Sequence, residues 1–306
     1  MWRSHAGHAP SGCATRKHPR SRTTKQDQEA RSGRKGKQVR KGAAGADEVV
    51  AKVHSLWRYP VKSMGGERVP QLLLDASGVY ADRYLGFESS GAAKGKPLLT
   101  GAERARMLLC QARFRAEPAE QPGFQQQQGA PGELASLVEV LTPEGSVLRA
   151  DDPALPGLLQ QGLPVKHPMW LRTSERPMTD CRPIALLSMQ TLRQISSELG
   201  QPVEAERFRA NLLLDVVSTN DTEKPDGGFA EDRFVGCRLR IGAQAEILIK
   251  ERDPRCRIIT LDPRTGAPLP ALMRLLADRH QGRAGVYATT LVPGPVCEGD
   301  VVRLIR

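Results

Sequence analysis

The chain is a succession of short apolar segments that are separated by glycine, proline or acidic turns. Segments of roughly four to eight residues, rich in Val, Ile and aromatic residues and bounded by turn residues, are typical of strands. Long helices do not alternate with these segments, and no G-x-G-x-x-G fingerprint is present, which argues against a dinucleotide-binding fold. We therefore expect a β-rich α+β fold with closed or nearly closed barrels and a few short helices.

In the first half, expected strands follow one another with turns between them, and Glu144-Gly145 forms a hairpin turn. The stretches Gly91–Pro97 and Gln121–Gly132 are expected to be loops, because they are rich in Gly, Pro and Gln. The expected strands are Val49–Val61, Val69–Leu74, Gly78–Phe87 after an initial turn, Met107–Phe114, Leu134–Leu141 and Val147–Leu148.

The second half adds two helices to a similar series of strands. Ser188 is expected to cap a helix whose apolar residues recur at helical spacing and which ends at Gly200. A second short helix is expected at Pro270–His280. The expected strands are Ile184–Leu187, Leu212–Val217, Ile258–Leu261, Gly285–Val292 and Val301–Ile305.

Charge separates the N-terminal segment from the rest of the 306 residues. Residues 1–46 contain twelve Lys and Arg and two acidic residues, so nearly all of the net charge of +11 lies there. The segment has almost no large apolar side chains, which predicts a basic disordered tail over residues 1–47. A transit peptide, a basic arm and upstream coding sequence remain alternatives. No nucleic acid is expected on the folded part, because its charge is nearly balanced and aromatic residues make up only 4%.

Composition also limits the compartment. No run of about 18 apolar residues is present, so no membrane span is predicted. The six cysteines show no C-x-x-C spacing and no secretory signal precedes them, which favours free thiols in a reducing, cytoplasmic location.

The stretch around Cys256 concentrates the reactive chemistry. Arg255 and Arg257 flank this cysteine, the expected strand Ile258–Leu261 follows, and Asp262–Gly266 is a turn. Two neighbouring guanidinium groups favour a thiolate, which can act as a nucleophile, a redox group or a soft-metal ligand. A half-buried structural cysteine beside two solvated arginines would give the same sequence.

Two further segments have residues suited to anion binding. Lys62-Ser63 stands at a glycine turn, and Arg207, Arg209 and Asn211 precede a buried strand. A lysine beside a hydroxyl, or a forked guanidinium, can hold a phosphate. A solvated turn and a surface ion pair are the structural alternatives.

Taken in order, these motifs resemble the MOSC family, relatives of the C-terminal domain of molybdenum cofactor sulfurase. The first motifs resemble the β-barrel domain that precedes it in the mitochondrial amidoxime reducing component and its bacterial homologues. The resemblance covers residues 49–306 and rests on nine motifs. They are Tyr59-Pro60-Val61-Lys62-Ser63, Asp82-Arg83-Tyr84, Asp180-x-x-Pro183, Arg207-Phe208-Arg209-Ala210-Asn211, Glu231-Asp232, Ile241-Gly242, Arg255-Cys256, Asp262-Pro263-x-Thr265-Gly266 and Gly299-Asp300-x-Val302.

The resemblance implies a MOSC N-terminal β-barrel domain over residues 48–165, packed on a MOSC domain over residues 166–306. It further implies a molybdenum cofactor (Mo-molybdopterin) bound between them. Cys256 matches the position whose sulfur binds the metal and is the implied catalytic residue. The positions that surround the cofactor and its phosphate are Lys62, Ser63, Arg83, Arg209 and Arg255, and those near the metal or pterin are Asp180 and Asn211.

The implied activity is a two-electron reduction of small N-hydroxylated compounds. Electrons would come from a separate partner, a ferredoxin, a flavodoxin or a cytochrome b5-type reductase system, because no iron–sulfur domain is expected in this chain. The anchoring helix of the mitochondrial relatives is not expected either. Asp253 stands where family members often have a cysteine, Ala210 replaces a proline, and residues 218–228 form a polar insertion.

A second function is compatible with the same resemblance, namely a cofactor carrier or a sulfur-transfer module with a persulfide on Cys256. The family's association with pyridoxal phosphate belongs to a separate domain of the sulfurase, so sulfur would have to come from another protein.

Overall fold

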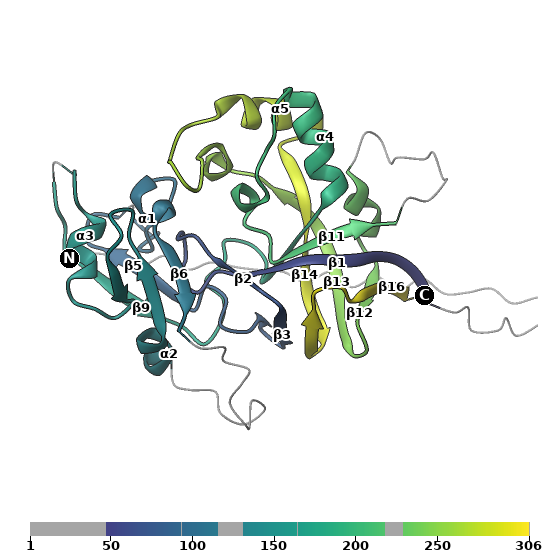
Figure 1. Cartoon of the computed structure of the whole chain (residues 1–306), viewed down its shortest axis with the longest axis horizontal. Helices are drawn as coiled ribbons and strands as arrows, with labels where there is room; N and C mark the ends of the chain where they lie inside the picture. Colours follow the sequence, from purple (N-terminus) through teal and green to yellow (C-terminus); the bar gives the residue numbers. More distant parts are fainter. Residues whose placement is uncertain (1–46, 93, 116–130, 164, 218–228, 306) are drawn as a thin grey trace, which may run out of the picture. The chain divides into compact units, whose positions relative to one another are not determined.

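A closed barrel of seven strands forms the largest sheet of the computed structural model (Figure 1). The structure describes residues 47–92, 94–115, 131–163, 165–217 and 229–305. Neighbouring strands follow the order β11-β10-β14-β13-β12-β16-β1, and β1 pairs back with β11 to close the barrel. The strands are β1 (Glu48–Arg58), β10 (Ile184–Ser188), β11 (Leu212–Val216), β12 (Arg238–Ile241), β13 (Ala245–Pro254), β14 (Arg283–Val292) and β16 (Val301–Ile305). The expected β-rich α+β fold is confirmed.

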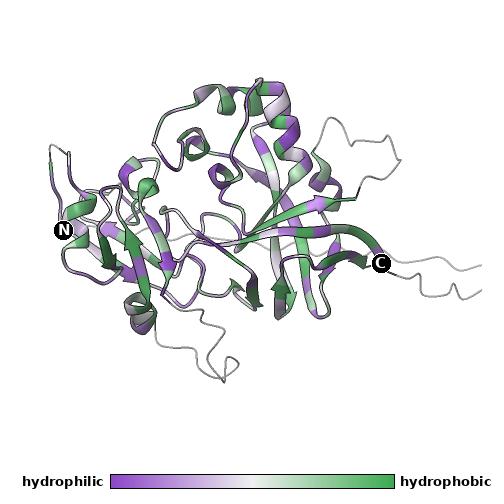
Figure 2. Cartoon of the chain, in the orientation of Figure 1, coloured by the Kyte–Doolittle hydropathy of each residue, from purple (hydrophilic) through white to green (hydrophobic). Residues whose placement is uncertain are grey.

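Alternation of side chains along the strands creates the interior of the barrel. Along β1, Ala51 and Val53 are buried whereas Lys52 and His54 are exposed. Apolar side chains of β13 and β14 meet those of β1 in one buried cluster. Figure 2 shows hydrophobic residues on the strands, interspersed with hydrophilic ones. This period of two is what places one face of each strand inside the barrel.

β1 joins the barrel although it lies far from the other strands in sequence. It pairs antiparallel with β11 and with β16, and its far end pairs with β2 (Glu67–Val69). The predicted boundary after residue 165 remains a prediction, but this strand of the first half completes the sheet of the second.

Three smaller sheets combine strands of the first half with two strands of the second half. β3 (Gln71–Asp75), β4 (Gly78–Val79) and β15 (Gly294–Cys297) make one of them. Pro70 separates β2 from β3, because proline has no N–H for a strand ladder, so the single strand expected at Val69–Leu74 is wrong. The other two sheets contain β5 (Leu85–Ser89) with β9 (Met169–Thr173), and β6 (Gln111–Phe114) with β7 (Val138–Leu141) and β8 (Val147–Arg149).

The sheet of β5 and β9 and the sheet of β6, β7 and β8 share a separate core with α1 (Ala105–Leu109), α2 (Pro131–Leu137) and α3 (Leu155–Leu159). The buried side chains of β3, β4 and β15 belong to the cluster of the barrel. The turn predicted at Glu144-Gly145 is confirmed, since β7 and β8 form a hairpin and Gly145 has φ +88°. The strands predicted at Met107–Phe114 and Leu134–Leu141 are wrong in their first halves, which form α1 and α2. Short apolar runs fit both a buried strand and a buried helical turn, so their periodicity cannot separate the two.

Two helices cover the barrel around a third cluster of buried side chains. α4 (Met189–Leu199) begins at Ser188, whose Oγ accepts a hydrogen bond from the Thr191 N–H, and ends at Gly200 with φ +75°. α5 is Pro270–His280. Both predicted helices are confirmed. Short 3₁₀ helices lie at η2 (Ala205–Phe208), η4 (Ala230–Phe234) and η5 (Arg257–Thr260).

The segment after Cys256 differs from its prediction. Residues Ile258–Leu261 were expected as a strand, but η5 occupies most of this segment and contacts α5. Ile259 is buried in the third cluster, which satisfies its apolar side chain without a strand. The turn predicted at Asp262–Gly266 is confirmed, because Asp262 Oδ1 accepts from the N–H groups of Arg264 and Thr265.

Some predicted segments lie outside the described residues. They are the basic tail up to residue 46, most of the loop expected at Gln121–Gly132, and the insertion at 218–228. Within the described ranges, no helix has the length and apolarity needed to cross a membrane.

Candidate functional site

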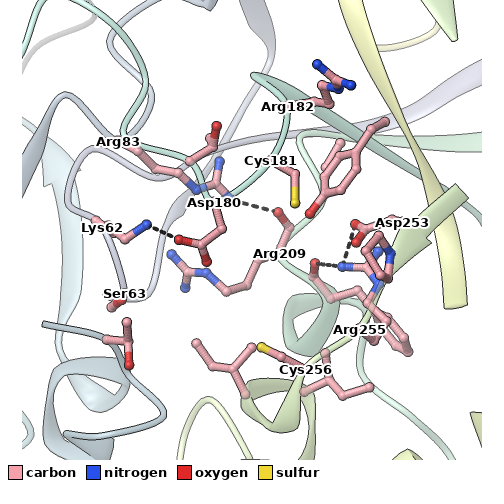
Figure 3. A pocket seen from close by; sticks show the side chains of 18 of the residues that line it. Lys62, Ser63, Arg83, Asp180, Cys181, Arg182, Arg209, Asp253, Arg255 and Cys256 are labelled. Atoms are coloured by element: carbon pink, nitrogen blue, oxygen red, sulfur yellow. Dashed lines mark hydrogen bonds and ion pairs between the residues drawn. The ribbon is translucent and has the colours of Figure 1, made fainter. Parts of the chain in front are cut away.

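A cavity of about 330 Å³ opens between the barrel and the first-half loops. It is lined by all eight residues predicted for the site, although they come from segments as distant as residues 62 and 256. They are Lys62, Ser63, Arg83, Asp180, Arg209, Asn211, Arg255 and Cys256. Figure 3 labels all of them except Asn211. Five cations and two carboxylates line the cavity, so it suits an anionic ligand.

Cys256 lies where β13 has ended and η5 begins. It is the N-cap residue of η5, with φ −112° and ψ 174°, and it is exposed. The preceding Pro254 ends β13, and the N–H of Arg255 bonds to the carbonyl of Gly282 at 2.8 Å. An exposed thiol at a short loop between two ordered elements is available to a ligand in the cavity.

The two arginines beside Cys256 are held by other groups. Arg255 Nε donates to Ala284 O at 2.6 Å, and its Nη1 donates to Phe208 O at 2.9 Å. Arg257 Nη2 donates to Ala102 O at 2.8 Å. Both guanidinium groups therefore secure the main chain around the cavity, and the predicted thiolate remains a prediction.

Arg83 and Arg209 enclose the ring of Tyr59. Their guanidinium carbons lie 4.6 Å and 4.4 Å from the ring centre, which is cation–π geometry. Asp82 is completely buried and forms an ion pair with Arg83. Burial, reinforced by the charge of Arg83, lowers the pKa of Arg209 to about 10. Burial raises the pKa of Tyr59 to about 12.

Three of the predicted site residues have a left-handed backbone. Ser63, Arg83 and Arg209 have φ values of +70°, +53° and +54°. This region is uncommon for residues other than glycine and costs of the order of 1 kcal/mol or more. Hydrogen bonds hold two of these backbones, from Arg83 N to Tyr59 O at 2.6 Å and from Arg209 N to Glu206 O at 3.2 Å. Strained conformations of this kind are concentrated at binding sites.

Lys62 and Asp180 form an ion pair across the cavity wall. Lys62 Nζ lies 2.6 Å from Asp180 Oδ1 and 2.8 Å from Met178 O. The lysine side chain is 10% exposed and that of Asp180 is 76% exposed, so the pair connects the interior of the cavity with its rim. Ser63 lies beside it, and its Oγ makes a long contact of 3.5 Å with Leu99 O.

Both the oxygen and the nitrogen of the Asn211 amide form hydrogen bonds with the main chain. Its Oδ1 accepts from Ala185 N and its Nδ2 donates to Trp57 O, both at 3.2 Å. The side chain is buried and joins the start of β10 to the end of β1. The structure therefore gives Asn211 a role in fixing the cavity wall.

Two guanidinium nitrogens have hydrogen-bonding capacity left. Arg209 Nη2 and Arg255 Nη2 are buried and have no hydrogen-bond partner among the described residues. Gly285, with φ +79°, permits this placement of Arg255, since a Cβ there would lie 2.9 Å from Arg255 Nη2 and 2.6 Å from Leu186 O. Buried unpaired donors are costly, and an anionic ligand would satisfy them.

The sequence did not single out several other residues of the cavity wall. Tyr287 comes from β14 and carries no local signal, because its neighbours become known only through strand pairing. Cys181 lies inside the Asp180-x-x-Pro183 motif, and Asp253 was noted only as a departure from a family pattern. Burial raises the pKa of Asp253 to about 6, although the charge of Arg255 opposes the shift.

Two family models match the sequence in the predicted order. One, described as the MOSC N-terminal beta barrel domain, matches residues 50–120. The other, described as the MOSC domain, matches residues 173–303 and so includes Cys256. A search of curated proteins returned no match.

Solved structures show weak likeness. The YuaD protein from Bacillus subtilis matches with a TM-score of 0.41 and 14% identity, over 83% of this chain and 95% of that one. YiiM from Geobacillus stearothermophilus matches with a TM-score of 0.31 and 18% identity, over 41% of this chain and 55% of that one. YiiM from Escherichia coli has a TM-score of 0.28 and 14% identity over the same shares. This level of likeness carries no functional information.

Proposed function

The chain belongs to the MOSC family, and from that premise we propose that it binds a molybdenum cofactor and reduces small N-hydroxylated compounds. The observation that carries this proposal is the exposed thiol of Cys256 in a cavity with a surplus of cations. A thiolate is a ligand that suits a soft metal centre, and guanidinium groups suit the phosphate of a pterin cofactor.

The residues present fit such a group. Arg209 and Arg255 each retain one buried nitrogen that lacks a partner among the described residues, so each has a donor left for an anionic group. Cys256 would supply the metal ligand, and Lys62 and Ser63 would complete the anion site. When bound, the cofactor supplies the exchange of two electrons between Mo(VI) and Mo(IV).

The chain itself would bind, orient and electrostatically support the cofactor and substrate. The ion pair of Arg83 with Asp82 and the stacking of Arg209 on Tyr59 fix the two guanidinium groups before any ligand arrives. Preorganised charges of this kind do not have to rearrange during reaction. Asp180, exposed at the rim beside Lys62, would meet the polar part of the ligand.

Electrons would come from a separate protein of the ferredoxin, flavodoxin or cytochrome b5-type reductase class. We also propose a cytoplasmic location, where a reducing environment would preserve the free thiols of Cys181 and Cys256.

The second candidate is a cofactor carrier or a sulfur-transfer module with a persulfide on Cys256. The observation that favours it is a second exposed thiol, Cys181, on the wall of the same cavity. A persulfide would release sulfide on mild reduction without any metal, which separates this candidate from the first.

The test is reduction of benzamidoxime with a reduced viologen dye as electron source, using protein from a host that makes the cofactor. We expect turnover by the wild type, loss of turnover in Cys256→Ala, and retention in Cys237→Ala, whose cysteine lies outside the cavity lining. Equal activity of the wild type and Cys256→Ala would contradict the proposal. A wild type without turnover that releases sulfide from Cys256 would favour the second candidate.

A further inference from the structure

A buried carboxyl and a phenol lie together on the cavity wall, and the proposed function does not use either. Asp253 near the end of β13 is 1% exposed, and Tyr287 belongs to the neighbouring strand β14. The strand register places Tyr287 opposite Glu251 and shifts between Arg252 and Pro254, the segment that contains Asp253. Each of the two side chains affects the pKa of the other, so they lie close together. Both side chains line the cavity that contains Cys256.

The surroundings of Asp253 bring its pKa closer to neutral pH. Its Oδ2 lies 2.8 Å from Arg255 Nη1 (Figure 3). Burial raises the pKa of Asp253 to about 6, even though the neighbouring groups of Arg255, Tyr287 and Arg83 lower it. Glu251 is the other charged group that faces this carboxyl, and it adds to the increase. A carboxylic acid that titrates this close to neutral pH can exchange a proton during turnover.

The phenol of Tyr287, in contrast, keeps its proton at neutral pH. Burial raises the pKa of Tyr287 well above its ordinary value, and the neighbouring carboxyl of Asp253 adds to the shift. Cys181 also faces Tyr287. Tyr287 therefore stays protonated and can pass a proton on only when it receives another from a neighbour such as Asp253.

We propose that Asp253 and Tyr287 form a proton-donating pair that serves the reduction in this cavity. This inference rests on the proposed function and adds the source of the protons. Reduction of an N-hydroxylated compound breaks the N–O bond and consumes two electrons and two protons. One proton goes to nitrogen and one to the departing oxygen, which leaves as water. The separate electron-donor protein supplies the electrons, and the pair delivers protons that solvent then replaces.

A role limited to holding Arg255 would predict different behaviour. In that case, replacing Asp253 would weaken cofactor retention and leave the pH dependence of the rate unchanged. A proton-donating role instead links the rate to the protonation state of Asp253. The rate should then fall as pH rises through about 6, where this carboxyl loses its proton.

The experiment measures the rate of benzamidoxime reduction against pH, together with molybdenum and pterin content, for the wild type, Asp253→Asn and Tyr287→Phe. Asp278→Asn is the control, because Asp278 is an exposed carboxyl of α5 and lies outside the cavity lining. A second readout uses the cofactor-free full chain. Its infrared band for a protonated carboxyl should disappear near pH 6 in the wild type and be missing from Asp253→Asn.

We expect Asp253→Asn to retain its cofactor, to lose the pH-dependent decrease and to reduce the substrate about a hundredfold more slowly, the lower range for loss of a general acid. Tyr287→Phe leaves the ion pair between Asp253 and Arg255 in place. It therefore provides an independent test if Asp253→Asn does not fold. Its rate should fall at least about tenfold with its cofactor content unchanged.

The outcomes separate this inference from the function on which it rests. If the wild type is loaded and active, and both variants keep its pH profile, the proton-donating role alone would be overturned. A wild type that contains neither molybdenum nor pterin would remove the proposed function and the proton-donating role together.

Discussion

Arg83 donates a hydrogen bond from Nη2 to the main-chain oxygen of Arg209 at 2.9 Å, which joins two of the cavity cations into one unit. Both also contact the ring of Tyr59. Like charges this close together repel, and Asp82 and the aromatic ring offset that repulsion. The arrangement explains how a cluster of positive charge can be built into the wall before a ligand neutralises it.

Arg209→Lys should lower the amount of bound pterin by about tenfold or more. A lysine keeps a positive charge but loses the planar stacking on Tyr59 and the forked donors that suit a phosphate. Pterin content of the purified protein measures the effect. Arg193→Lys, on the exposed side of α4, is the control and should retain wild-type content. Equal pterin in both variants would show that Arg209 does not hold the cofactor.

Gly285→Ala should destabilise the fold by about 2–4 kcal/mol. The residue has φ +79°, and a Cβ would lie 2.6 Å from Leu186 O and 2.9 Å from Arg255 Nη2. Gly145→Ala separates the cost of the positive φ from the cost of the close contacts, because Gly145 has φ +88° and nothing within 4 Å of its Cβ position. Urea unfolding should give a loss of about 1 kcal/mol for Gly145→Ala. Equal losses in the two variants would mean that the close contacts at Gly285 do not matter.

The raised pKa of Asp253 predicts a stability effect with a defined sign. A carboxyl whose folded pKa lies above its unfolded value stabilises the fold below that unfolded value, and the contribution disappears as pH rises through the folded pKa. The window runs from the ordinary value of 3.8 to about 6, and a shift of this size corresponds to about 3 kcal/mol at most. Unfolding free energies between these limits should therefore fall with pH more steeply in the wild type than in Asp253→Asn.

The pKa of Glu246 is shifted in the opposite direction to that of Asp253, so Glu246 serves as a comparison. Hydrogen bonds from Arg238 and Arg240 lower the pKa of Glu246, so its contribution is present near neutral pH and is lost as pH falls. Glu246→Gln should therefore remove stability at neutral pH and not in acid. A wild type and an Asp253→Asn variant with parallel pH curves would contradict the assigned shift of Asp253.

Ser188→Ala should cost about 1–2 kcal/mol of stability. The Ser188 hydroxyl caps α4 by accepting from Thr191 N, and it donates to Glu231 Oε2 at 2.5 Å. Glu231 is completely buried, and burial raises its pKa, so the loss of one partner is not replaced by water. Ser197→Ala, at an exposed position of the same helix, should change the unfolding free energy by less than about 0.5 kcal/mol. Similar losses in both variants would show that the cap is not important.

Much of the fold could be predicted because local signals agreed with each other. Ser188 and Gly200 mark the two ends of α4, and Asp262–Gly266 forms its turn through contacts between near neighbours. The errors at Met107–Phe114 and Ile258–Leu261 arose where a short apolar run is buried in either conformation. In those places packing against distant elements decides the secondary structure.

In the candidate site, too, motifs in the sequence were predictable and contacts between distant segments were not. Motif order brought Lys62 and Cys256 into one predicted site, and the structure places both on one cavity. The direction of Arg255 could not be predicted, because its partners Ala284 and Phe208 are close only in the folded chain. Tyr287 escaped notice for a similar reason, since its proximity to Asp253 depends on the pairing of β13 with β14.

The central claim is that Cys256 binds a molybdenum cofactor in the cationic cavity. The most direct measurement is molybdenum and pterin per chain, in the wild type and in Cys256→Ala, purified side by side from a host that makes the cofactor. We predict close to one molybdenum and one pterin per wild-type chain and a sharp loss of molybdenum in the variant. Absence of both from the wild type, or equal molybdenum in the two proteins, would contradict the claim.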